Sequence, residues 1–98
     1  MPIIDLSFPI RPHFRWKVEP VLRSSHAAGD LFQSTILTVA CHAYTHVDAP
    51  VHFLPGDRDI ASMPVDQWIG AARCRFMALP LRIEGADGSP VRAVALID

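Results

Sequence analysis

Short apolar runs, of the length that β-strands have, recur along the 98-residue chain. Nine prolines and several turn-forming residues separate them, and the runs are rich in β-branched side chains, which favour extended structure. The pattern predicts strands over residues 3–6, 14–24, 32–41, 74–83 and 91–97. Pro20 interrupts the second of these, so this segment is expected at a sheet edge.

One short helix is predicted between the third and the fourth strand. Pro64 is suited to the first position of a helix, because proline has no backbone N–H to leave unbonded there. Val65, Trp68 and Ile69 would then lie on one side, and Gly70 would end the helix. The expected domain consists mostly of strands, with this helix as its single helical element.

Composition and charge restrict the class of protein. Half of the residues are apolar and 19% are charged, as in a single globular domain. The formal net charge of −1 gives no electrostatic surface for nucleic acid. The apolar runs are far shorter than the roughly 20 residues that span a membrane, and the chain begins without the basic start and apolar run of a secretion signal. We therefore expect no nucleic-acid partner, no membrane association and a cytoplasmic location.

The two cysteines, Cys41 and Cys74, are too few for a disulfide framework. In a cytoplasmic protein they are expected as reduced thiols. Cys41 precedes His42 and could be a nucleophile or a metal ligand, but free cysteine is among the most buried residue types. A structural role in a strand is the favoured interpretation.

Residues with side chains suited to metal binding or acid–base catalysis are concentrated in one segment, which has neither helical nor strand periodicity. Three of the five histidines lie between positions 42 and 52, in the pattern His-x-x-x-His-x-Asp-x-x-x-His. Its members are His42, His46, Asp48 and His52. Imidazole and carboxylate groups are ligands for zinc, manganese and iron. This density of them indicates a metal or acid–base site.

Neither regular element would bring the first three of these groups to one ion. On a helix, Asp48 would lie about 200° around the axis from His46. On a straight strand, His42 and His46 would be about 13 Å apart, whereas zinc ligands lie about 2.0–2.2 Å from the metal. We therefore expect a sharp turn between His42 and Asp48, with His42 at the end of the strand that reaches Cys41.

The same segment resembles the signature of the cyclase-like metal-dependent hydrolases, which include bacterial kynurenine formamidases and isatin hydrolases. That signature runs His-x-Gly-Thr-His-x-Asp-x-Pro-x-His, and the chain departs from it at Tyr44, which replaces the glycine. The opening Asp-Leu-Ser-Phe-Pro-Ile, at residues 5–10, and the order of helix and strand after residue 64 are similar as well. The resemblance extends over nearly the whole chain.

The resemblance implies an α/β fold of the swivelling β/β/α type, usually in dimers or larger assemblies. It implies that His42, His46 and Asp48 bind zinc, or manganese, and that His52 is the general acid/base. The family takes a further histidine and a glutamate from a downstream half. Because the chain also ends on the apolar run at residues 91–97, we expect residues 1–98 to be the N-terminal portion of one such domain.

The implied reaction is hydrolysis of an amide or cyclic amide, as in the conversion of N-formylkynurenine to kynurenine and formate. The substrate would be a small aromatic amide, and Trp16, Tyr44 and Phe53 are the candidate apolar contacts for it. An isatin-hydrolase-like enzyme that prefers manganese would use the same residues. A different class is also open, in which the chain is an inactive fragment or split half that acts as a metal-binding or assembly module.

Overall fold

The computed structural model describes residues 2–71 and 74–97. The chain divides into two compact units, the first formed by Met1–Pro9 with Cys41–Asp98 and the second by Ile10–Ala40. All of the residues in the histidine segment belong to the first unit.

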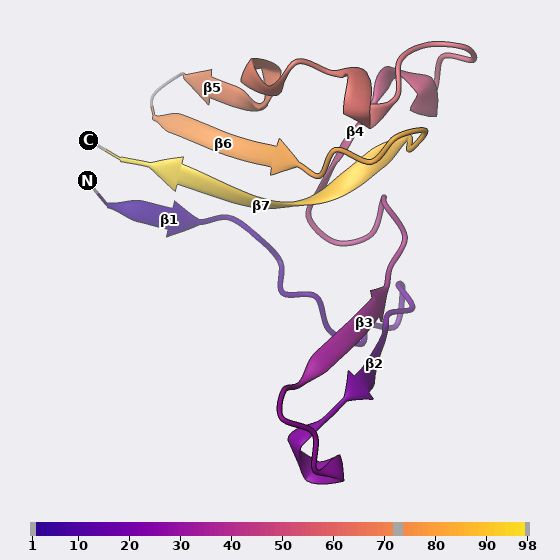
Figure 1. Ribbon diagram of the computed structural model, residues 1–98. Helices are drawn as coiled ribbons and strands as arrows, with labels where there is room; N and C mark the ends of the chain where they lie inside the picture. Colours follow the sequence, from indigo (N-terminus) through magenta and orange to yellow (C-terminus); the bar gives the residue numbers. More distant parts are fainter. Residues whose placement is uncertain (1, 72–73, 98) are drawn as a thin grey trace. The chain divides into compact units, whose positions relative to one another are not determined.

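An antiparallel sheet forms the first unit (Figure 1). Its main path follows the order β1-β7-β6-β5, and β4 pairs with the other end of the long strand β7. The bounds are β1 (Ile3–Asp5), β4 (His46–Asp48), β5 (Ile69–Ala71), β6 (Arg75–Pro80) and β7 (Gly88–Leu96). The strands expected at residues 3–6, 74–83 and 91–97 are therefore confirmed, with small changes of length.

Strand β7 is the centre of this sheet. Its C-terminal half pairs with β1 on one side and β6 on the other, so that Leu96 lies opposite both Ile3 and Arg75. Its N-terminal end pairs with β4, where Gly88 lies opposite Asp48. The apolar run at residues 91–97 thus pairs inward. The sheet edges that remain unpaired within the described residues belong to other strands.

The second unit is a β-hairpin of β2 (Glu19–Ser24) and β3 (Ser34–Thr38), joined through the single 3₁₀ turn η1 (His26–Ala28). The Ser25 side chain accepts a hydrogen bond from the backbone of Ala28 and so caps this turn. Gly29 ends it with φ of 89°, a left-handed conformation that glycine adopts without strain. The strands expected at residues 14–24 and 32–41 are both present but shorter than predicted.

The predicted helix at residues 64–70 is wrong. Pro64 is followed by one 3₁₀ turn, η4 (Val65–Trp68), and the chain then enters β5. A single turn is too short to stabilise an α-helix, since helix nucleation is costly. Gly70 ends no helix but pairs with Phe76, and a Cβ atom there would lie 2.0 Å from Cε1 of that ring.

The other helical segments of the first unit are the 3₁₀ turns η2 (Pro50–His52) and η3 (Ile60–Ser62). Residues 2–71 and 74–97 therefore contain strands and 3₁₀ turns but no α-helix. The expectation of a mostly stranded structure is confirmed, whereas the helical part of the predicted β/β/α domain stays a prediction. In this described part of the chain, no helix has the length and apolar character needed to cross a membrane.

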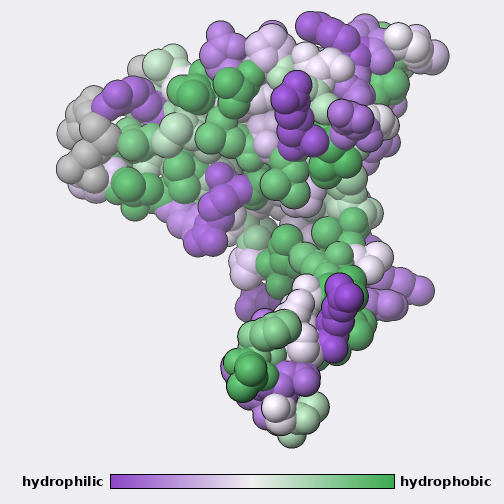
Figure 2. Space-filling model, viewed as in Figure 1, coloured by the Kyte–Doolittle hydropathy of each residue, from purple (hydrophilic) through white to green (hydrophobic). Residues whose placement is uncertain are grey.

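Few side chains of the first unit are fully enclosed. The buried apolar residues are Ala43, Tyr44, Ala49, Ile60 and Ala95. Large apolar side chains remain exposed on its strands, including Ile3, Ile4, Ile69, Phe76 and Leu79. Figure 2 shows such apolar residues, in green, on much of the visible surface. The core of this unit is thus concentrated near the histidine segment.

An ion pair joins β1 to β7. Arg92 donates hydrogen bonds from its guanidinium to both carboxylate oxygens of Asp5, and the Nε–Oδ1 distance is 3.1 Å. The Arg92 guanidinium, with help from the backbone N–H of Ser7, lowers the pKa of the Asp5 carboxyl from 3.8 to about 2. The pair thus favours the ionised carboxylate in the folded chain.

Replacing Asp5 should therefore destabilise the chain in a pH-dependent way. The folded pKa lies below the unfolded one, so the contribution of Asp5 is present above about pH 4 and is lost as the pH falls through about 2. Asp5→Asn should lower the melting temperature at pH 7 but much less near pH 2. Thermal melts of this variant and of the control Asp66→Asn test this, and equal effects of Asp5→Asn at both pH values would contradict it.

Candidate metal centre

A tight turn carries the histidine segment into β4. Strand β3 ends at Thr38, before Cys41, so the turn and not a strand carries His42, contrary to our expectation. Tyr44 has φ of 59°, which is left-handed backbone and reverses the chain between His42 and β4. The sharp turn predicted between His42 and Asp48 is therefore confirmed. It lies where the resembled signature has glycine.

A tyrosine in this conformation costs on the order of 1–2 kcal/mol relative to glycine. Its surroundings explain how the chain accommodates that cost. Only 5% of Tyr44 is exposed, and its ring centroid lies 6.4 Å from that of Phe8. The backbone N–H of Phe8 also donates a 2.7 Å hydrogen bond to Thr45 Oγ1. Burial and this bond fix the turn to the segment that follows β1.

The turn brings His42, His46 and Asp48 together. Asp48 Oδ1 lies 2.8 Å from His42 Nδ1 and 3.4 Å from His46 Nε2. His46 Nδ1 is 2.8 Å from the carbonyl oxygen of Tyr44, which can only accept, so Nδ1 carries the proton. Nε2 of His46 is therefore the atom that is left for another partner, and it faces a carboxylate oxygen, an arrangement that suits a cation.

The backbone of β7 lies close to the His42 ring at Gly88. A Cβ atom added at Gly88 would lie 2.6 Å from Cε1 of that ring and 2.8 Å from the carbonyl oxygen of Val47. Any larger residue at position 88 would therefore displace the ring or the β4 strand. The glycine permits the close approach on which the position of His42 depends.

The 3₁₀ turn η2, which begins at Pro50 and ends at His52, places the His52 side chain at the cluster. Its backbone N–H donates to the carbonyl oxygen of Ala49 at 3.0 Å. The His52 ring then stacks on the His42 ring, with 3.8 Å between centroids and 29° between planes. All four members of the sequence motif thus lie at one place.

Asp87 joins them, although sequence reasoning missed it. Its Oδ1 lies 3.2 Å from His42 Nε2, and its Oδ2 lies 3.6 Å from His52 Nδ1. Interaction with His42, and to a smaller degree with His52, holds the pKa of the Asp87 carboxyl below its ordinary value. The available signal was the position of Asp87 shortly before the apolar run at residues 91–97, which belongs to the strand that pairs with β4.

A family model described as "Putative cyclase" matches residues 4–83 of the chain. The chain belongs to the cyclase family. The match includes His42, His46, Asp48 and His52 but ends before Asp87. Comparison with curated proteins and with solved structures gave no match.

The residues of this cyclase-family chain fit a metal ion. One set of possible ligand atoms belongs to His42, His46 and Asp48, and a second to His42, His52 and Asp87; within each set, the atoms lie within 4.8 Å of one another. His42 Nε2 is buried and makes no well-aligned hydrogen bond within the described residues. A buried polar atom of this kind calls for a partner, and a cation would provide one.

An open hollow of about 700 Å³ lies beside the candidate metal centre of the cyclase-family chain. It is lined by Asp48, Ala49, Pro50, Phe53, Leu54, Met63, Gln67 and Trp68. A metal-ligand candidate, Asp48, thus shares a hollow with two aromatic rings. Phe53 was expected to contact the substrate, whereas Trp68 was expected only on one side of the predicted helix.

The other predicted substrate contacts are not among the residues that line this hollow. Tyr44 is buried in the turn. Trp16 belongs to the second unit, where its ring stacks on His13 with 4.7 Å between centroids. The roles of Trp16, Tyr44 and Phe53 toward a substrate stay predictions.

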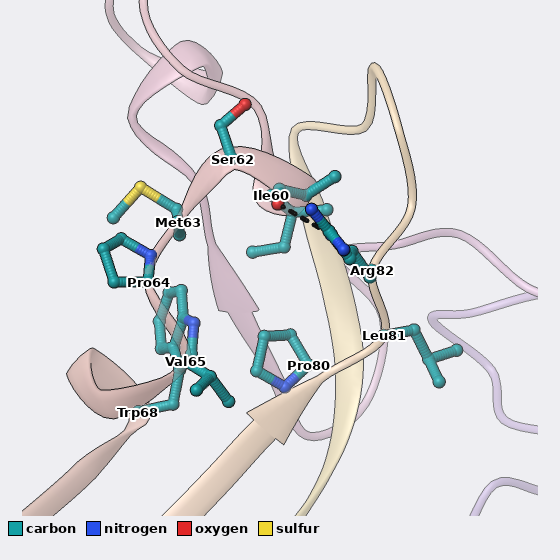
Figure 3. A pocket seen from close by; sticks show the side chains of 10 residues that line it. Ile60, Ser62, Met63, Pro64, Val65, Trp68, Pro80, Leu81 and Arg82 are labelled. Atoms are coloured by element: carbon teal, nitrogen blue, oxygen red, sulfur yellow. Dashed lines mark hydrogen bonds between the residues drawn. The ribbon is translucent and has the colours of Figure 1, made fainter.

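A second hollow, of about 440 Å³, lies between residues 60–68 and 80–82 (Figure 3). Met63, Pro64 and Trp68 face Pro80 and Leu81 across it, and Arg82 Nε donates to the carbonyl oxygen of Ala61 at 3.4 Å. Met63 and Trp68 line both hollows. None of the predicted site residues lines this second one.

Proposed function

We propose that the chain provides the metal-binding half-site of a metal-dependent amide hydrolase, most similar in activity to an arylformamidase. Family membership supports a cyclase-like hydrolase. The observation that carries the finer proposal is the convergence of His42, His46 and Asp48, with His52 stacked beside them. These are the residue types that hold zinc or manganese in hydrolases.

His42, His46 and Asp48 would hold the ion, zinc or alternatively manganese. When bound, such an ion polarises a carbonyl group and lowers the pKa of a water molecule. His46 is already oriented for this, since the Tyr44 carbonyl fixes its proton on Nδ1. Asp48 lies between both histidines, so its carboxylate balances the charge of a divalent ion.

His52 would transfer the proton. A histidine has an ordinary pKa near 6.5, so it can accept a proton from water and return it to the leaving nitrogen at neutral pH. Pro50 restricts the backbone of the η2 turn and keeps His52 against His42. The base is thus held beside a ligand residue before any substrate binds.

The substrate we propose is a small aromatic amide such as N-formylkynurenine. The hollow that contains Asp48 also presents the rings of Phe53 and Trp68, which offer an apolar surface for an aromatic group. A cyclic amide such as isatin, with manganese as the ion, would fit the same residues. We also expect the active assembly to be a homo-oligomer.

A second candidate function is that of an inactive metal-binding or assembly module. The apolar side chains exposed on β1, β5 and β6 favour it, because exposed apolar surface of this kind promotes association. The family's downstream histidine and glutamate would then have to come from another segment.

One experiment separates the two candidates. Purified chain, loaded with zinc or manganese, is assayed with N-formylkynurenine and with isatin, both alone and joined to a downstream segment that carries the family's further histidine and glutamate, while light scattering gives its mass. The main proposal predicts no turnover by residues 1–98 alone and metal-dependent turnover of the formamide by an oligomer once that segment is present. Stoichiometric metal with no turnover of either substrate in the presence of that segment would contradict it and favour the module, and turnover of isatin alone would correct the substrate.

A further inference from the structure

Asp87 is the one acidic residue of the cluster that neither the sequence motif nor the family match contains. Its two carboxylate oxygens face different rings: Oδ1 is 3.2 Å from His42 Nε2, and Oδ2 is 3.6 Å from His52 Nδ1. A carboxylate that contacts both a ligand candidate and the proposed base can orient both.

The backbone around Asp87 is fixed to the loop that carries the motif. The carbonyl oxygen of Asp87 accepts a 2.9 Å hydrogen bond from the N–H of Ala49. Ala86 accepts one of 2.9 Å from Ile60, and Gly85 donates to the carboxylate of Asp59. Three contacts therefore hold this turn, one to the motif and two to the segment at residues 59–60. The position of the Asp87 side chain follows from them.

The contacts of His42 show why the charge of Asp87 matters. Asp48 Oδ1 lies 2.8 Å from His42 Nδ1, and Asp87 Oδ1 lies 3.2 Å from Nε2 of the same ring. The two carboxylates thus contact both nitrogens of His42, and both favour a positive partner there, either a proton or a cation. Asp87 therefore adds negative charge where His42 needs a positive partner.

We propose that Asp87 is a positioning residue of this site, which holds His52 in its Nδ1–H tautomer and strengthens cation binding at His42. The proposal rests on the proposed function for its role in catalysis. His52 Nδ1–H points to Asp87 Oδ2, so Nε2 is the atom left to accept a proton. The two atoms are 3.6 Å apart, which is longer than a hydrogen bond, and contacts of catalytic residues are often long before the substrate binds.

The test is Asp87→Asn, with Asp57→Asn as the matched control on a nearby exposed carboxyl. ¹⁵N NMR of the histidine rings, at a pH where they are neutral, should show His52 as the Nδ1–H tautomer in the wild type and a shift toward Nε2–H in Asp87→Asn. His46 is an internal control, because the Tyr44 carbonyl and not Asp87 fixes its tautomer. Zinc titration should give unchanged stoichiometry and an affinity lower by about 10–100-fold.

An unchanged His52 tautomer together with unchanged zinc affinity would overturn the proposal. Loss of zinc stoichiometry with an unchanged tautomer would overturn it in favour of direct ligation by Asp87. Asp87→Ser, with circular dichroism as a check of folding, repeats the test if the asparagine variant is unstable. The tautomer is measured without metal or substrate, so a failure of the proposed hydrolase activity does not affect this result.

Discussion

His46→Ala is expected to lower the zinc or manganese content of the purified chain at least tenfold. The variant removes Nε2, which the hydrogen bond of Nδ1 to the Tyr44 carbonyl leaves available and which faces Asp48 Oδ1 at 3.4 Å. His42 and Asp48 alone would leave an ion with two protein ligands instead of three, and structural and catalytic zinc sites have at least three. Elemental analysis after dialysis measures the effect.

The control for this variant is His26→Ala, which changes a histidine in the hairpin unit, outside the cluster. Its metal content should equal that of the wild type. His46 is half-buried, so its replacement should leave the fold intact, which a thermal melt verifies. An unchanged metal content in His46→Ala would show that the ion is not bound by these residues.

His52→Ala is expected to retain the metal while kcat falls by about 10²–10⁴-fold. The reason is that His52 contacts the cluster by stacking on the His42 ring and lies outside the set of His42, His46 and Asp48. Loss of a proton-transfer group should lower kcat more than it changes KM. Steady-state kinetics on the metal-loaded protein, with metal content measured on the same sample, provide both numbers.

Two results would contradict this assignment. Loss of metal together with loss of activity would make His52 a ligand, as the second set with His42 and Asp87 allows. Retention of full activity would remove His52 from the mechanism. His26→Ala again serves as the control, since it should affect neither quantity.

Much of the strand arrangement follows from local sequence. The apolar runs at residues 3–6, 74–83 and 91–97 all became strands of one sheet. Their pairing was not predictable, because register depends on contacts between distant segments such as Ile3 and Leu96. The prediction of a helix after Pro64 was wrong because the pattern there is short. One turn of apolar periodicity cannot distinguish a helix from a 3₁₀ turn that leads into β5.

The part of the site that lies within one continuous segment, residues 42–52, was predictable from sequence. Ligand geometry alone required the turn between His42 and Asp48, and Tyr44 provides it with φ of 59°. Asp87 could not be found in this way, since it reaches the cluster only through the pairing of β4 with β7. Trp68 was likewise not identified as a site residue, because only the three-dimensional structure places it in a hollow with Asp48.

The central claim is that His42, His46 and Asp48 bind a divalent ion, and anomalous diffraction at the zinc edge tests it most directly. Crystals of the zinc-loaded chain should show one strong peak within about 2.0–2.2 Å of His46 Nε2 and an Asp48 carboxylate oxygen. Crystals of His46→Ala, treated in the same way, should lack that peak. A wild-type chain without zinc at this position, or with zinc bound only by other residues, would contradict the account.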